Sequence, residues 1–161
     1  MIQVGDRVPS VTVRRMGANG IETLDMTAYL TGRRVLLFGV PGAFTPSCSE
    51  QHLPGYVARA DDFRAKDVDE VACLAVNDAF VLGEWARMQG AEGKVTLLSD
   101  GNAAFAEATG LAFDGSALGL GTRLQRFAML VEDGVVKALR GEDAPAAVTV
   151  SGAESMLAEV A

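Results

Sequence analysis

Residues 34–52 have the sequence Arg34-Val35-Leu36-Leu37-Phe38-Gly39-Val40-Pro41-Gly42-Ala43-Phe44-Thr45-Pro46-Ser47-Cys48-Ser49-Glu50-Gln51-His52. The apolar run 34–40 is typical of a buried strand. A turn with two prolines follows, and beyond it apolar residues recur at helical spacing, at Leu53, Tyr56, Val57, Ala60 and Phe63. We therefore predict a strand, a tight turn and a helix, with a cysteine near the start of that helix.

The position of Cys48 favours a reactive thiol. Thr45 is a good N-cap residue, and Pro46 suits the first helical position, where its missing N–H costs nothing. Cys48 would then lie in the first turn, where unpaired N–H groups and the helix dipole favour an anion and lower the pKa of a thiol. A buried structural cysteine is the alternative, and the helix start alone does not decide between the two.

Composition and charge narrow the class of protein. The 161 residues suit one compact domain, 1–161, and the net charge of −7 argues against a nucleic-acid partner. No apolar run reaches membrane-spanning length, and residues 1–7 lack a secretion signal. Two cysteines suggest a reducing, cytoplasmic setting. With a single histidine and no CxxC pair, we expect no metal and no cofactor.

Further segments complete an α/β pattern. We predict buried strands over 71–76 and 95–98, and a hairpin over 126–139 around Asp133-Gly134, a dipeptide that suits tight turns. Weaker signals predict a hairpin from 11–14 and 21–24, a surface loop over 111–122, and a last helix over 156–160 opened by a capping box at Ser151 and Glu154. This order is that of a thioredoxin-like fold, a central mixed sheet flanked by helices with an N-terminal hairpin extension.

Three details of the helices are also predicted. Pro54 should kink the helix that follows Cys48, which then continues to about Lys66. Asp25 and Asp100 should cap short helices. The helix after Asn77-Asp78 should carry its apolar side chains on one side, at Phe80, Val81, Trp85 and Met88.

His52 and Cys73 each allow two interpretations. His52 lies four residues after Cys48, so it is either a proton shuttle or a histidine that only bonds backbone near the kink. We favour backbone bonding, because no orienting carboxylate is evident. Cys73 lies in the middle of an apolar strand, which favours an inert, buried thiol.

The spacing Pro41-x-x-x-Thr45-x-x-Cys48 is the signature of the peroxiredoxins. The longer string from Phe38 to Gly55 resembles the type II subfamily, which includes peroxiredoxin five. Further stretches agree, namely Val71-Ala72-Cys73-Leu74-x-Val76-Asn77-Asp78, Gly83-Glu84-Trp85 and Arg126-Phe127-x-Met129. The resemblance covers almost the whole chain.

The resemblance implies a thiol peroxidase that reduces hydrogen peroxide and organic hydroperoxides. Cys48 would attack the O–O bond and become a sulfenic acid. Thr45 and Arg126 would hold the thiolate and the peroxide, Pro41 would shield the pocket from water, and the backbone N–H groups of Ser47 and Cys48 would donate to the peroxide. The family also implies a homodimer, for which Phe44, Phe80 and Trp85 are interface candidates, although each could equally belong to the core.

The sequence departs from some relatives in how it would be recycled. The stretch 146–151, where some type II relatives carry a resolving cysteine, contains none. Cys73 matches the second cysteine of other relatives, but it would need local unfolding to reach Cys48. We therefore expect recycling on Cys48 alone by glutathione or glutaredoxin, with thioredoxin as the other possible reductant. A redox sensor oxidised once is the alternative function. A cysteine hydrolase is disfavoured, because it needs a Cys–His–Asx arrangement.

Overall fold

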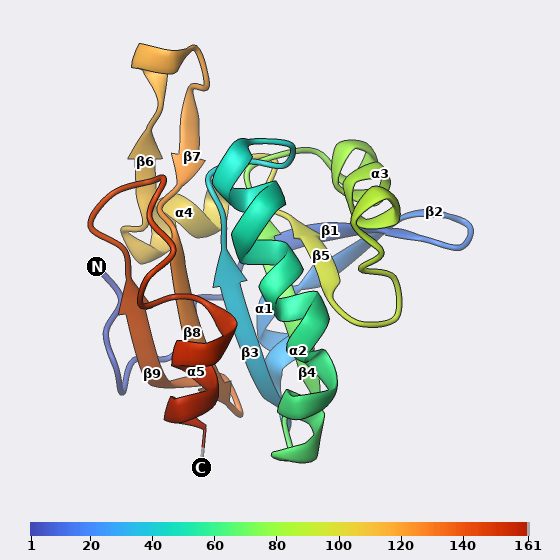
Figure 1. The fold of residues 1–161 in the computed structure, drawn as a ribbon, viewed down its shortest axis with the longest axis vertical. Coiled ribbons are helices and arrows are strands. Elements are labelled where there is room, and N and C mark those ends of the chain that lie inside the picture. Colours follow the sequence, from blue (N-terminus) through green and yellow to red (C-terminus); the bar gives the residue numbers. More distant parts are fainter. Residues whose placement is uncertain (161) are drawn as a thin grey trace.

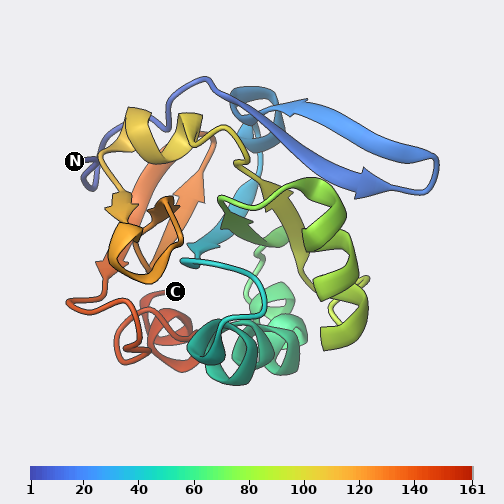
Figure 2. The ribbon, with the colours of Figure 1, turned by 90° about the horizontal axis from the view of Figure 1, so that it is seen from above.

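A computed structural model describes residues 1–160 and shows a seven-stranded sheet between two layers of helices (Figures 1 and 2). The strands follow the spatial order β2-β1-β5-β4-β3-β8-β9. Their bounds are β1 Thr12–Gly17, β2 Gly20–Asp25, β3 Arg34–Gly39, β4 Glu70–Ala75, β5 Thr96–Ser99, β8 Phe127–Glu132 and β9 Val135–Gly141. The helices are α1 Met26–Leu30, α2 Leu53–Ala65, α3 Ala79–Gln89, α4 Ala104–Thr109 and α5 Ala153–Glu159.

Both faces of the sheet are buried, which explains the continuous apolar runs in its central strands. In β3, Leu36 and Phe38 face the layer formed by α2, α3 and α5. Val35 and Leu37 face the opposite layer, formed by α1 and α4. The strand thus divides its side chains between two hydrophobic cores, as the two-residue period of a strand requires.

The pairing directions confirm the predicted mixed sheet. β3 pairs with β4 and β4 with β5 in parallel, whereas β8 pairs antiparallel with β3 and with β9. Asp133 and Gly134 join β8 to β9 with φ angles of 49° and 80°. These are the left-handed values that a tight hairpin turn requires, so the predicted turn is confirmed. The β1–β2 hairpin is also confirmed, and it projects beyond the sheet (Figure 2).

The segment 111–122, predicted to be a surface loop, contains regular structure. β6 Ala112–Asp114 pairs antiparallel with β7 Thr122–Leu124, and a 3₁₀ turn at Ser116–Leu118 lies between them. The prediction was wrong because three residues per strand are too few to show a period of two. This second hairpin projects past the carboxyl end of β3, next to the turn that carries Cys48 (Figure 1).

Two predictions about the helices were wrong, one about the buried side of α3 and one about the cap of the last helix. Phe80 and Met88 of α3 are exposed, and its buried side is formed by Ala79, Leu82, Trp85 and Ala86. Trp85 is therefore a core residue. The capping box of the last helix is absent as well, since the hydroxyl of Ser151 donates to Glu142 and Gly152 occupies the N-cap position.

Candidate active site

The helix that carries Cys48 begins as predicted and then widens. Pro46 is its first helical residue, and the Ser49 N–H donates to the Thr45 carbonyl at 2.9 Å. Residues Cys48–His52 form a π-helical turn in which the Leu53 N–H reaches the Cys48 carbonyl. Pro54 lies two residues after this turn. In place of the kink predicted at the proline, the helix has a widened turn just before it. The N–H groups of Ser47 and Cys48 precede the first intrahelical bond.

Thr45 caps this helix with its backbone and uses its side chain elsewhere. The hydroxyl donates to the Gly42 carbonyl at 2.7 Å, so the predicted side-chain cap does not form. A hydroxyl has one hydrogen to donate and two lone pairs that accept. Thr45 therefore retains the capacity to accept a hydrogen bond from a molecule in the adjacent pocket.

Arg126, which immediately precedes β8, brings three segments together at Cys48. Its Nη2 donates to the Cys48 sulfur at 3.0 Å, and its Nη1 lies 2.9 Å from His52 Nδ1. Its Nε donates to the Pro145 carbonyl at 2.9 Å. Cys48 and His52 can both reach one guanidinium because residues four apart lie on the same side of a helical turn.

The contacts of His52 define its protonation state. Arg126 can only donate, so His52 Nδ1 must accept, and the ring proton must lie on Nε2, 2.9 Å from the Ser151 carbonyl. Burial and the neighbouring Arg126 charge lower the pKa of His52 to about 3. A histidine held neutral in this way does not shuttle protons at neutral pH. The predicted backbone bond exists, and the contact with Arg126 is a second one that the sequence did not reveal.

The charge of Arg126 is unusually uncompensated. The side chain is 3% exposed, and no salt bridge to a carboxylate involves it within residues 1–160. A buried cation without a partner is costly. A negative charge at the Cys48 sulfur, 3.0 Å from Nη2, would offset this cost.

A pocket of about 330 Å³ opens beside this arrangement. Four residues of the predicted site line it, namely Pro41, Thr45, Ser47 and Arg126. The remaining lining is largely apolar and comes from the β6–β7 hairpin and from residues 145–146, with Phe113, Leu118, Leu120, Pro145 and Ala146. Cys48 itself is fully buried and does not line the pocket, but its sulfur contacts Arg126, which does.

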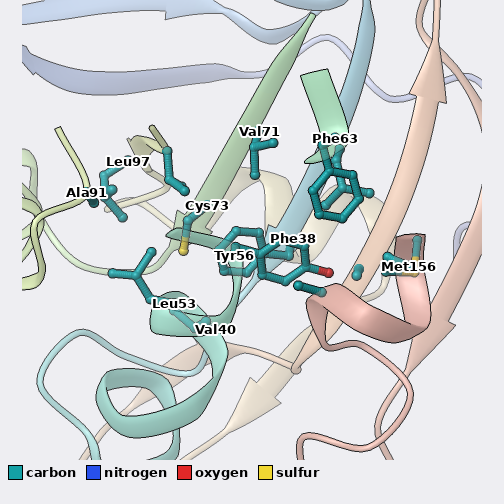
Figure 3. Close-up of a cluster of buried hydrophobic side chains, with 14 of the residues drawn as sticks. Phe38, Val40, Leu53, Tyr56, Phe63, Val71, Cys73, Ala91, Leu97 and Met156 are labelled. Atoms are coloured by element: carbon teal, nitrogen blue, oxygen red, sulfur yellow. The ribbon is translucent and has the colours of Figure 1, made fainter. Parts of the chain in front are cut away.

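Cys73 is placed apart from this pocket. It lies within β4, is fully buried, and packs among apolar side chains that include Val40, Leu53 and Leu97 (Figure 3). Burial and the nearby Cys48 raise its pKa well above the ordinary value. Both properties agree with the inert thiol favoured by its sequence context.

The loop after β9 supplies hydrogen-bond acceptors that no sequence motif predicts. Its backbone carbonyls at Pro145, Ala146 and Ser151 accept from Arg126, Ser47 and His52 respectively. Backbone acceptors carry no residue-type signal, so these contacts could not be read from a single sequence. No cluster of metal-binding side chains occurs within residues 1–160, and no helix there is long and apolar enough to cross a membrane.

A fully buried cysteine at a helix start contacts a buried arginine beside a sheet flanked by helices on both faces, an arrangement that suits thiol-based redox chemistry. A family model described as Redoxin matches residues 3–157. Peroxiredoxin-2E, chloroplastic, from Arabidopsis thaliana is 42% identical over 97% of this chain and 68% of its own length. Peroxiredoxin-2E-2, chloroplastic, from rice is 45% identical over 97% and 71%.

Solved structures agree with the sequence relatives. Reduced Prx3 in complex with H₂O₂ from Vibrio vulnificus has a TM-score of 0.95 and 43% identity, with each chain covered completely. Peroxiredoxin 5 from Alvinella pompejana has a TM-score of 0.87 and 29% identity, over 99% of this chain and 98% of that one. The chain belongs to the Redoxin family and, within it, to the type II peroxiredoxins. It is accordingly a thiol-dependent peroxidase, an oxidoreductase with an antioxidant function.

Proposed function

We propose that Cys48 is the peroxidatic residue of this enzyme. Its thiolate attacks one oxygen of the peroxide, an S–O bond forms as the O–O bond breaks, and the second oxygen leaves as hydroxide or alkoxide and takes up a proton. The products are a sulfenic acid on Cys48 and water or an alcohol. The observation that carries this assignment is the 3.0 Å contact from Arg126 Nη2 to the Cys48 sulfur beside the pocket.

Each polar group of the site has a separate role in binding the peroxide. Arg126 donates to the thiolate and to the departing oxygen, whose negative charge grows as the O–O bond breaks. Thr45 accepts from the O–H of the hydroperoxide, because its own hydrogen is engaged by the Gly42 carbonyl. The N–H groups of Ser47 and Cys48 add donors at the helix start, and Pro41 keeps water from the sulfur.

The substrates we propose are hydrogen peroxide and organic hydroperoxides. Arg126 and Thr45 recognise the O–O–H group that all of these share. The apolar wall formed by Phe113, Leu118 and Leu120 suits the alkyl portion of a larger hydroperoxide.

A thiol reductant would complete the cycle. It attacks the sulfenic sulfur and expels water, and a second thiol then releases Cys48 and leaves as part of a disulfide. We propose glutaredoxin with glutathione, or thioredoxin, as the source of these thiols, because Cys73 is buried with a raised pKa. We further propose that residues 1–161, of which residue 161 lies outside the described part, act as one domain, and that the chain is a cytoplasmic homodimer.

Peroxide kinetics in three variants test this function. Cys48→Ser should abolish peroxide reduction. Arg126→Gln and Thr45→Val should each lower the second-order rate constant by about 10²- to 10³-fold, the usual effect of losing one fixed hydrogen-bonding group at a developing charge. The thiolate fraction, followed by ultraviolet absorbance, should change far less than the rate. Equal losses in rate and in thiolate fraction would contradict the roles given to Arg126 and Thr45.

The same assay separates the enzyme from a stoichiometric redox sensor, which the same residues would also serve. We expect many turnovers per chain with glutaredoxin and glutathione, or with thioredoxin. A single burst of peroxide consumption with every donor would instead identify a sensor.

A further inference from the structure

Glu142, the first residue after β9, is the centre of a hydrogen-bond cluster. Its carboxylate accepts from the backbone N–H groups of Thr149 at 2.9 Å, Val150 at 3.0 Å and Ser151 at 2.8 Å. It also accepts from the hydroxyl groups of Thr149 and Ser151. One carboxylate therefore gathers five donors from residues 149–151 and closes the loop 142–151 into a ring.

The same loop supplies three carbonyl acceptors to the active site. Pro145 accepts from Arg126 and Ala146 from Ser47, while Ser151 accepts from both His52 and Tyr56. The loop has no regular secondary structure, so no helix or strand fixes these carbonyls. Glu142 accepts five hydrogen bonds that hold the loop, and the Ser155 hydroxyl of α5 adds one, to the Thr149 carbonyl.

The loop is also tied to Arg126 through the main chain. The N–H of Glu142 donates to the Arg126 carbonyl at 3.0 Å, so the start of the ring contacts the arginine. Further along the ring, the Pro145 carbonyl accepts from Arg126, and the Ser151 carbonyl accepts from His52, which contacts Arg126. A carboxylate placed here thus controls two of the three groups that orient the guanidinium, Pro145 and His52.

We propose that Glu142 is a positioning residue for peroxide reduction, which aims the Arg126 guanidinium at Cys48 by holding the loop 142–151 closed. The proposal rests on the function assigned above to Cys48 and Arg126. Glu142 does not line the pocket, so its hydrogen bonds act on the site through the loop, while its charge also opposes the lowering of the His52 pKa.

The ionised form of Glu142 holds the loop 142–151 closed. Partial burial raises its pKa, but the bonds from Ser151 and Thr149 outweigh that effect and lower the pKa to about 2. A neutral amide in its place keeps two donors of its own, which would oppose the donors of the loop. Glu142→Gln should therefore loosen the ring, and Glu142→Ala should open it.

The test compares peroxide rate constants in four single variants. We expect losses of about threefold for Glu142→Gln and about ten- to hundredfold for Glu142→Ala, because displacing a catalytic donor costs less than deleting it. Glu142→Asp keeps the charge and should recover part of the rate. Glu154→Gln is the matched control, because Glu154 lies just beyond the loop but bonds only Arg59, and its rate should not change.

A double-mutant cycle distinguishes positioning from general stability. If Glu142 acts through Arg126, adding Glu142→Gln or Glu142→Ala to Arg126→Lys should cost less than twofold beyond Arg126→Lys alone. Equal fold losses in the wild-type and Arg126→Lys backgrounds would overturn the proposal, as would a wild-type rate in Glu142→Gln and Glu142→Ala. Should Glu142→Ala not fold, the Glu142→Gln cycle decides alone. Inactivity of the wild type, or activity of Cys48→Ser, would instead refute the proposed function.

Discussion

Arg126 shows how one side chain can define a site. It is 3% exposed, and its donors go to a sulfur, a neutral histidine and a backbone carbonyl. None of these neighbours carries a fixed negative charge. The guanidinium can therefore interact strongly with a negative charge on the Cys48 sulfur. An arginine already paired with a carboxylate would interact with that charge less strongly.

His52 should make the stability of the protein depend on pH. The unfolded chain takes up a proton at the ordinary histidine pKa near 6.5, whereas the folded site resists it down to a pKa of about 3. The unfolded state therefore binds more protons in this range, and stability is lost as pH falls below about 6.5. We expect His52 to contribute a loss of up to about 1.4 kcal/mol per pH unit.

Chemical denaturation of the wild type and of His52→Gln at pH 7.5, 6 and 5 measures this effect. The chain has a single histidine, so the variant should lack most of the slope between pH 6.5 and 5. Parallel pH profiles for the two proteins would show that His52 is not the cause. Glu142, with its lowered pKa, should add a further loss only below about pH 4.5.

At the residue scale, the sequence predicted the reactive cysteine better than its surroundings. Cys48, Thr45 and Pro41 lie in one short motif whose spacing is informative. Arg126 is one of many arginines and was selected only by resemblance. The contact of His52 with Arg126 joins residues 74 positions apart, and no local pattern in the sequence indicates such a pairing.

Among the elements, β3 and β8 pack tightly against each other next to the active-site turn. Gly39 pairs with Phe127, and a Cβ on Gly39 would lie 2.1 Å from Cε1 of the Phe127 ring. This ring is fully buried and stacks on Phe105, so it has little room to move. Gly39 is therefore required by space at the point where β3 leads into the active-site turn.

Gly39→Ala should lower the free energy of unfolding by about 1–3 kcal/mol, the usual cost of overpacking a core. It should also reduce peroxidase activity, because Phe127 directly follows Arg126. Adding Phe127→Leu should recover part of the stability, since the clash is with the ring. Gly141→Ala, where a Cβ would meet nothing, serves as the control in denaturant titrations. An unchanged midpoint in Gly39→Ala would refute the predicted clash.

The elements were predictable where the sequence carries a long pattern. β3, β4 and the β8–β9 hairpin have continuous apolar runs or a turn dipeptide, and the structure places them within one or two residues of the predicted bounds. The short β6 and β7 strands lack such a pattern. The prediction for α3 rested on its large apolar side chains, but Phe80 and Met88 are exposed and two alanines lie on the buried side.

At the scale of the whole molecule, exposed aromatic side chains near the site support the proposed homodimer. Phe44 is 49% exposed and Phe80 is 66% exposed, whereas most large apolar side chains are buried. Phe44 also packs against Trp85, with ring centroids 6.4 Å apart, so α3 and the active-site turn share one surface. A second copy of the chain would cover these rings.

Phe80→Arg should therefore shift the protein from dimer to monomer, because a charge in an apolar interface is costly. Sedimentation velocity over a range of concentrations measures the change. Val4→Arg, at an exposed apolar position on the N-terminal segment, is the control and should leave the dimer intact. A monomeric wild type, or a dimeric Phe80→Arg variant, would contradict the proposed interface.

Within residues 1–160, no carboxylate pairs with Arg126, and this has a consequence for the later steps of the proposed cycle. A reduced thiolate neutralises the buried guanidinium, but a mixed disulfide on the same sulfur has no charge to offer. Each turnover would thus remove the counter-ion from a cation that is only 3% exposed. The adduct should melt at a lower temperature than the reduced enzyme, and this loss of stability would help open the turn at the stage when an incoming thiol must reach the sulfur.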